Sequence, residues 1–248
     1  MSFWPATYRI DGWTSQPPWL NDAEVAHAWQ SWPRFVDNPS AVTVWHPEIG
    51  ANDLVPTGSP TMFNAGFGRF SSMGFGLFDV DAIAPSFSGA TTPYSVAYLF
   101  TANTAQTLNR YGLAIASTAD DRQSPLAMAF TGNNADFAFF RRDDANNQLN
   151  GGTFTCAVGT WYLVEAYFDG ALFTSRLDGA IVDNAIPLVP PGLVTSDTFC
   201  LSAYHGASGH VLASTARFAA LGATGGSVWS SSTQAAIREY LLRFKPVL

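Results

Sequence analysis

Residues 161–179 read Trp-Tyr-Leu-Val-Glu-Ala-Tyr-Phe-Asp-Gly-Ala-Leu-Phe-Thr-Ser-Arg-Leu-Asp-Gly, and this stretch decides the fold. Its first half alternates as a β-strand does, because successive side chains on a strand point to opposite faces. Asp169-Gly170 supplies the positive φ that a tight hairpin turn needs. A second strand over 172–177 ends at another Asp-Gly pair. Two strands and two tight turns in so short a stretch predict antiparallel structure.

The alternation divides residues 161–168 between two faces. One face carries Tyr162, Val164, Ala166 and Phe168. The other carries Trp161, Leu163, Glu165 and Tyr167. Because Glu165 is charged, we expect the second face to be the wetter one and Phe168 to lie in the core.

From residue 42 onward the chain consists of short strand patterns between turn signals. The predicted strands are 42–45, 75–80, 94–101, 111–117, 126–131, 137–142, 161–168, 172–177, 198–204 and 211–221. No long helical pattern separates them, so the sequence predicts an all-β fold, an antiparallel jelly-roll β-sandwich in one domain. At 248 residues the chain is long enough to bury a large core.

Several of these motifs resemble one family. The Trp-led strand and the aromatic-Asp-Gly turn of residues 161–179 are similar to the central hairpin of laminin-G-like, concanavalin-A-like domains. The stretch WHPEIGANDL at 45–54 resembles the opening of bacterial and bacteriophage members, and residues 236–245 resemble their closing helix. The resemblance covers roughly residues 42–248 and implies the sandwich fold. It implies little about function, because one fold hosts many activities.

Residues 1–41 differ from the rest of the chain and are predicted to form a separate N-terminal arm. Five of the eight Trp residues lie there: Trp4, Trp13, Trp19, Trp29 and Trp32. Asn21 to Glu24 has the pattern of a helix start, and apolar residues follow it at helical spacing up to Trp32. Because Trp is enriched at interfaces, we expect these five residues to anchor the arm on a partner, the alternative being packing over the sandwich.

A helix is predicted to close the domain over residues 232–245. Ser231 and Gln234 have capping-box spacing at its start. One apolar stripe follows, formed by Ile237, Tyr240, Leu241 and Phe244. We expect that stripe to pack on the core.

The composition excludes several functions. Only 12% of residues are charged and the net charge is −7, which opposes binding to nucleic acid or to an anionic membrane surface. No stretch is long and apolar enough for a membrane helix, and residues 1–20 lack a secretory signal. Cys156 and Cys200 are predicted to be buried thiols, with a disulfide between them as the alternative.

The residues give no support for catalysis. The four Glu residues do not form the closely spaced carboxylate pair that sandwich glycosidases use. No nucleophile elbow is present, and the two His residues of His205-Gly-Ala-Ser-Gly-His210 lack a third ligand for a metal site. We therefore expect no enzymatic activity and no cofactor. A calcium site is the alternative, because the loops at 133–136 and 143–147 are rich in side chains with oxygen ligands. Ordinary turns use the same residue types.

These features lead to the hypothesis of a non-enzymatic, virion-associated structural protein of a bacteriophage, such as a capsid decoration or tail-associated protein. It would be made in the host cytoplasm, reside in the virion and contact other virion proteins or its own subunits as a homo-oligomer. The alternative is a carbohydrate-binding, lectin-like module or a host-receptor-binding protein. In that case exposed Trp161 and Tyr167 would stack on sugar rings.

Overall fold

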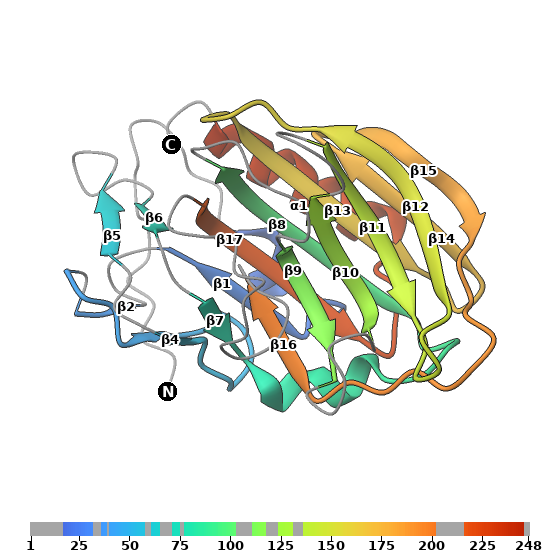
Figure 1. Cartoon of the computed structure of the whole chain (residues 1–248). Helices are drawn as coiled ribbons and strands as arrows, with labels where there is room; N and C mark the ends of the chain where they lie inside the picture. Colours follow the sequence, from blue (N-terminus) through green and yellow to red (C-terminus); the bar gives the residue numbers. More distant parts are fainter. Residues whose placement is uncertain are drawn as a thin grey trace.

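The chain folds as a sandwich of two antiparallel β-sheets (Figure 1). The computed structural model describes residues 17–31, 36–38, 40–57, 61–64, 71–74, 77–102, 111–117, 124–130, 136–201 and 216–245. Within these residues one sheet has eight strands and the other has seven. The predicted all-β antiparallel class is confirmed.

The spatial order of the strands differs from their order along the chain. The eight-stranded sheet runs β15 (Ala180–Pro187), β14 (Leu172–Leu177), β13 (Trp161–Phe168), β8 (Tyr94–Ala102), β17 (Ala216–Gly225), β6 (Ser71–Gly74) and β5 (Thr61–Asn64), and β1 (His27–Gln30) also pairs with β17. The seven-stranded sheet runs β12 (Gln148–Thr155), β11 (Asp136–Arg142), β10 (Ser124–Phe130), β9 (Tyr111–Ala116), β16 (Thr198–Leu201), β7 (Leu77–Asp79) and β4 (Val55–Thr57). A two-stranded sheet joins β2 (Val36–Asp37) to β3 (Val44–Trp45), and the helices are η1 (Pro18–Asn21), η3 (Asp81–Phe87) and α1 (Ser231–Phe244).

The main core lies between the two large sheets. As the alternation predicts, Val164, Ala166 and Phe168 of β13 point into it. Phe168 is fully buried, and the Arg141 guanidinium carbon lies 3.8 Å from the centre of its ring. The hairpin has the predicted turn, with Gly170 at φ +104°. The register of β13 and β14 therefore follows directly from the sequence pattern.

A second apolar layer covers the outer face of the eight-stranded sheet. Helix α1 lies behind that sheet in Figure 1 and packs Ile237, Tyr240 and Leu241 into this layer. The predicted helix is confirmed, with its N-cap one residue earlier than expected, because the Ser230 hydroxyl accepts the backbone N–H of Thr233. No helix among the described residues is long and apolar enough to cross a membrane.

The expected helix between Asn21 and Trp32 is wrong. The short 3-10 helix η1 comes first, and strand β1 then pairs antiparallel with β17, so that Trp29 lies opposite Leu221. Trp29 faces the main core while its neighbour Ala28 faces the outer layer, which is the alternation of a strand. Residues 17–31 thus belong to the sandwich, and a boundary at residue 41 does not separate them from it.

Candidate functional site

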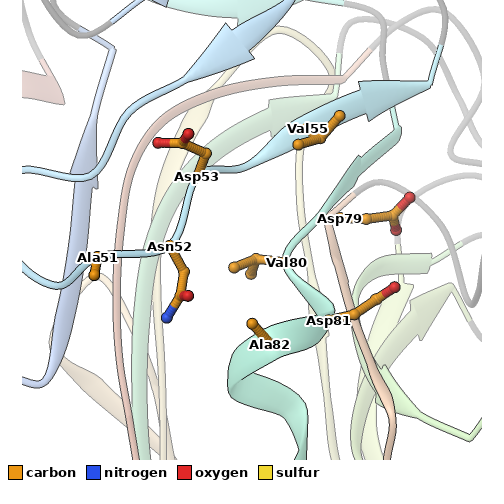
Figure 2. A pocket seen from close by; sticks show the side chains of 8 residues that line it. All are labelled: Ala51, Asn52, Asp53, Val55, Asp79, Val80, Asp81 and Ala82. Carbon is orange, nitrogen blue, oxygen red and sulfur yellow. The ribbon is translucent and has the colours of Figure 1, made fainter.

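The candidate site is an open hollow of about 460 Å³ at one edge of the seven-stranded sheet. Figure 2 shows the loop with Asn52 and Asp53 on one side of it and the segment from Asp79 to Ala82 on the other. Its eight lining residues are Ala51, Asn52, Asp53, Val55, Asp79, Val80, Asp81 and Ala82. The lining thus combines three carboxylates and one amide with small apolar side chains.

Pairing of β4 with β7 brings the two sides of the hollow together. Val55 lies directly opposite Asp79 in this antiparallel pair. The loop before β4 turns at Gly50, whose φ of +92° favours glycine. The indole N–H of Trp29 then donates to the backbone oxygen of Asn52 at 3.2 Å, which ties the loop to the core. Val55 keeps 51% of its surface exposed and offers an apolar contact at the rim.

A histidine holds the carboxylate of Asp53. His46 Nδ1 lies 2.8 Å from Asp53 Oδ1, and His46 Nε2 lies 3.3 Å from Asp37 Oδ2. The hydrogen bond with Asp53 raises the pKa of His46, as does the bond with Asp37, and these outweigh the effect of partial burial. His46 therefore joins the loop of the hollow to strand β2.

A thiol contacts the carboxylate of Asp79. Cys200 Sγ lies 2.7 Å from Asp79 Oδ1, across the pair of strands β7 and β16. Burial raises the pKa of Asp79 and the charge of Asp81 adds to this rise, whereas the thiol acts in the opposite direction. Cys156 and Cys200 are both buried thiols, as predicted, and form no disulfide with each other.

Trp19 and Trp29, expected as exposed interface anchors, are buried within the chain. Trp19 is 1% exposed, its indole N–H donates to Glu48 Oε2 at 2.8 Å, and its ring packs edge-on against Tyr240. Trp29 is 0% exposed and lies in the main core. An exposed-anchor role is therefore wrong for these two. Trp4, Trp13 and Trp32 lie outside the described residues.

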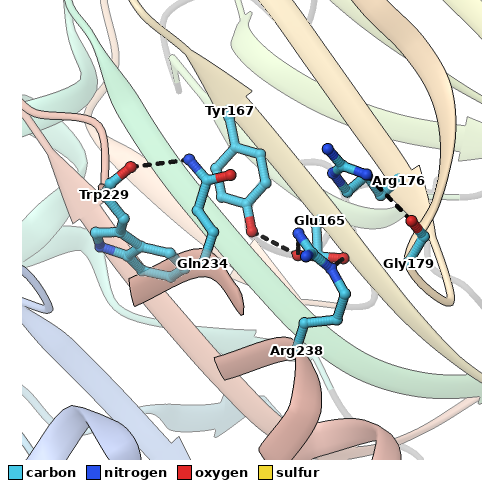
Figure 3. Close-up of polar contacts among 7 residues, drawn as sticks. All are labelled: Glu165, Tyr167, Arg176, Gly179, Trp229, Gln234 and Arg238. Carbon is cyan, nitrogen blue, oxygen red and sulfur yellow. Dashed lines mark hydrogen bonds and ion pairs between the residues drawn. The ribbon is translucent and has the colours of Figure 1, made fainter. Parts of the chain in front are cut away.

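Trp161 and Tyr167, expected to stack on sugars, are also buried. Both belong to the outer apolar layer to which α1 contributes, so neither presents a free ring face to a ligand. The expectation of a wetter face at Glu165 is wrong for the same reason, since Glu165 is fully buried. Figure 3 shows that the Tyr167 hydroxyl donates to Glu165, at 2.6 Å, and that Arg238 of α1 pairs with the same carboxylate.

The loop at 143–147 forms a turn organised by one carboxylate. Asp143 accepts hydrogen bonds from the backbone N–H groups of Ala145, Asn147 and Gly192 and from the side chain of Asn147. These bonds occupy both carboxylate oxygens. Among the described residues, no group of three or more His, Cys, Asp or Glu side chains is arranged to hold a metal ion. Residues 133–135 and 205–210 lie outside the described part of the chain.

No protein-family model matches the chain, and no curated protein matches it in sequence. Solved structures match it in fold. Trypanosoma rangeli sialidase, as the covalent intermediate with 2,3-difluorosialic acid, has a TM-score of 0.64 and 14% identity over 98% of this chain and 36% of the sialidase. The binding domain of botulinum neurotoxin serotype D has a TM-score of 0.57 and 8% identity over 88% of this chain and 52% of that chain.

The chain therefore spans about a third of the sialidase and about half of the neurotoxin domain. At such low identity the likeness shows the β-sandwich fold alone. The sandwich is the part of the laminin-G-like resemblance that is confirmed, since no family model supports the finer assignment.

Proposed function

We propose that this chain is a carbohydrate-binding module and that the hollow between Asn52 and Asp81 holds an uncharged sugar. One observation carries the proposal: hydrogen-bonding side chains and the exposed Val55 line the same hollow. Sugar hydroxyls both donate and accept, so they suit carboxylate acceptors beside an amide that does both. Val55 can contact the apolar C–H groups of the ring.

The fold likeness favours this function over a structural role in a virion. One of the solved structures is Trypanosoma rangeli sialidase in complex with sialic acid, which matches over 91% of this chain with a TM-score of 0.56. The hypotheses of virion localisation, of other virion proteins or own subunits as partners and of a homo-oligomer rest on the sequence features alone. A glycan-binding module within a host-receptor-binding protein would be compatible both with sugar binding and with location in a virion.

The charge of the hollow favours neutral sugars over sialic acid. None of its eight lining residues is cationic, and three of them are Asp. A sialic acid carboxylate in the hollow would meet like charges without a counter-charge, which is unfavourable. We therefore propose a ligand that differs from that of the sialidase.

A glycan array tests the proposal, with lactose and 3′-sialyllactose as a matched pair that differs only by sialic acid. We expect selective binding to neutral glycans, weaker binding to their sialylated forms, and loss of binding in Asn52→Ala and Asp81→Asn. Glu239→Gln, on the exposed side of α1, is the control and should bind as the wild type does. No selective binding, or equal binding by all variants, would overturn the proposal.

We further propose that the module is non-enzymatic. Glu165, the only Glu of the 161–179 stretch, is buried against Arg238 and Tyr167, where neither water nor substrate can reach it. Incubation with β-glucans should release no reducing sugar. Release that disappears in Glu165→Gln would contradict this expectation.

A further inference from the structure

Asp79 is the lining residue whose carboxylate has a buried partner. Asp79 of β7 and Cys200 of β16 lie directly opposite each other in the antiparallel pair, so their side chains lie on the same face of the sheet. Cys200 is fully buried, whereas Asp79 is only partly buried and lines the hollow. The contact therefore joins the interior of the protein to the candidate site.

The direction of this hydrogen bond follows from the chemistry of the two groups. An ionised carboxylate can only accept, so the Cys200 thiol donates to Asp79 Oδ1. Thr198 lies two residues before Cys200 on the same strand face, and its hydroxyl is 3.1 Å from the sulfur. With the thiol proton committed to Asp79, the Thr198 hydroxyl can donate to the sulfur. The three side chains then form a chain of donors that ends at the hollow.

The other neighbours of Asp79 supply no donor among the contacts described. Val55 faces it from β4, and Asp81 follows it at the start of η3 with a like charge. Burial and the charge of Asp81 both favour the protonated form of Asp79, and the thiol favours the ionised form. Of the three influences on Asp79, the Cys200 thiol is thus the one that favours the ionised, hydrogen-bond-accepting form.

We propose that Cys200 is a positioning residue of the hollow, whose thiol holds one oxygen of Asp79 and leaves the other oxygen for a hydroxyl group of the ligand. This inference rests on the proposed function, because it assigns Asp79 a contact with the bound sugar. A buried thiol with no such role would only fill space, and its replacement by Ala or Ser would leave Asp79 unchanged.

The test on the ligand-free protein is a carboxyl ¹³C NMR titration of Asp79, whose signal is assigned by its loss in Asp79→Asn. In Cys200→Ala the donor is gone, so Asp79 should take up its proton at higher pH than in the wild type. Cys200→Ser keeps a donor of similar size and should titrate near or below the wild type. Cys156→Ser, the other buried thiol, is the control. An unchanged titration in Cys200→Ala, or the same shift in Cys156→Ser, would overturn the inference.

The same glycan panel separates this inference from the proposed function. Binding of neutral glycans should weaken roughly three- to tenfold in Cys200→Ala, as expected for the loss of one positioning hydrogen bond, and should be kept in Cys200→Ser. If Asp79→Asn abolishes binding and Cys200→Ala leaves it intact, the hollow binds sugar but the thiol does not position Asp79. If the wild type binds no glycan, the proposed function fails, and the titration alone still decides whether the thiol controls Asp79.

Discussion

Arg238 of α1 forms a bidentate ion pair with Glu165 of β13, with Nε 2.9 Å from Oε2 and Nη2 2.8 Å from Oε1. Glu165 is fully buried, and burial of an ion is costly unless a partner of opposite charge accompanies it. The helix supplies that partner. The ion pair therefore helps to hold α1 against the outer face of the eight-stranded sheet.

Arg238→Ala should destabilise the protein strongly, because it removes both hydrogen bonds of the ion pair and leaves the buried carboxylate of Glu165 with the hydrogen bond from Tyr167 among the contacts described. We expect a loss on the order of 3 kcal/mol in the free energy of unfolding, measured by urea titration. Arg243→Ala is the matched control, since Arg243 pairs with Glu239 one turn away on the exposed face of the helix and should cost less than about 0.5 kcal/mol.

Removal of both charges should cost less than removal of one. In the double variant Glu165→Leu/Arg238→Leu neither member of the pair is left buried without the other, so part of the lost stability should return. Additive losses in the double variant would show that the two side chains do not act as a pair.

Phe168→Ala should lower the free energy of unfolding by about 3–5 kcal/mol, because the ring is fully buried between the sheets and stacks under Arg141. Ile181→Ala, at a position half exposed on β15, is the control and should change stability little. A urea midpoint equal to that of the wild type for Phe168→Ala would contradict the register of β13.

A chain beginning at Ser40 should fail to fold. It lacks Trp19 and Trp29 from the two apolar layers and leaves β17 without β1. A chain beginning at Pro17 keeps all of these contacts and is the matched control. Circular dichroism and light scattering should show an unfolded or aggregated product for the first chain only. A soluble, β-rich product from Ser40 would instead support an N-terminal arm that lies outside the core.

The stabilising contribution of His46 should be lost as the pH rises above about 6.5. Its pKa is raised in the folded state, so its contribution is fully present below the unfolded value of about 6.5 and is lost as the pH rises through the folded value. Melting temperatures measured from pH 5.5 to 8.5 should therefore fall less with rising pH in His46→Gln than in the wild type. Identical pH profiles would contradict a raised pKa of His46 in the folded state.

The sequence predicts best those strands in which side chains of different character alternate between the two faces and which end at a defined turn. The limits of β13 and β14 are as predicted, since the Asp-Gly pairs at 169–170 and 178–179 mark the end of β13 and both ends of β14. Strands β12 and β15 escape prediction, because edge strands half exposed to solvent need no regular apolar pattern. Strand β1 escapes prediction because it has only four residues, and in so short a segment the spacing of apolar residues does not separate a strand from a helix.

The candidate site is the least predictable part of the chain. Its residues come from segments 51–55 and 79–82, and only the pairing of β4 with β7 brings them together. Nothing in either segment alone indicates a partner. The burial of Glu165 escapes prediction for a similar reason, because a strand pattern separates two faces but does not show that a distant helix will cover one of them.

The pairing of β1 with β17 has a consequence for synthesis of the chain. His27 to Gln30 lie opposite Ala223 to Ala220, so nearly the whole chain separates the two strands. During translation β1 leaves the ribosome long before β17 is synthesised. Until then the apolar residues of β1 cannot pair with β17 and remain exposed. Such distant pairing slows folding and exposes the nascent chain to aggregation. Expression at low temperature or with added chaperones should therefore raise the soluble yield.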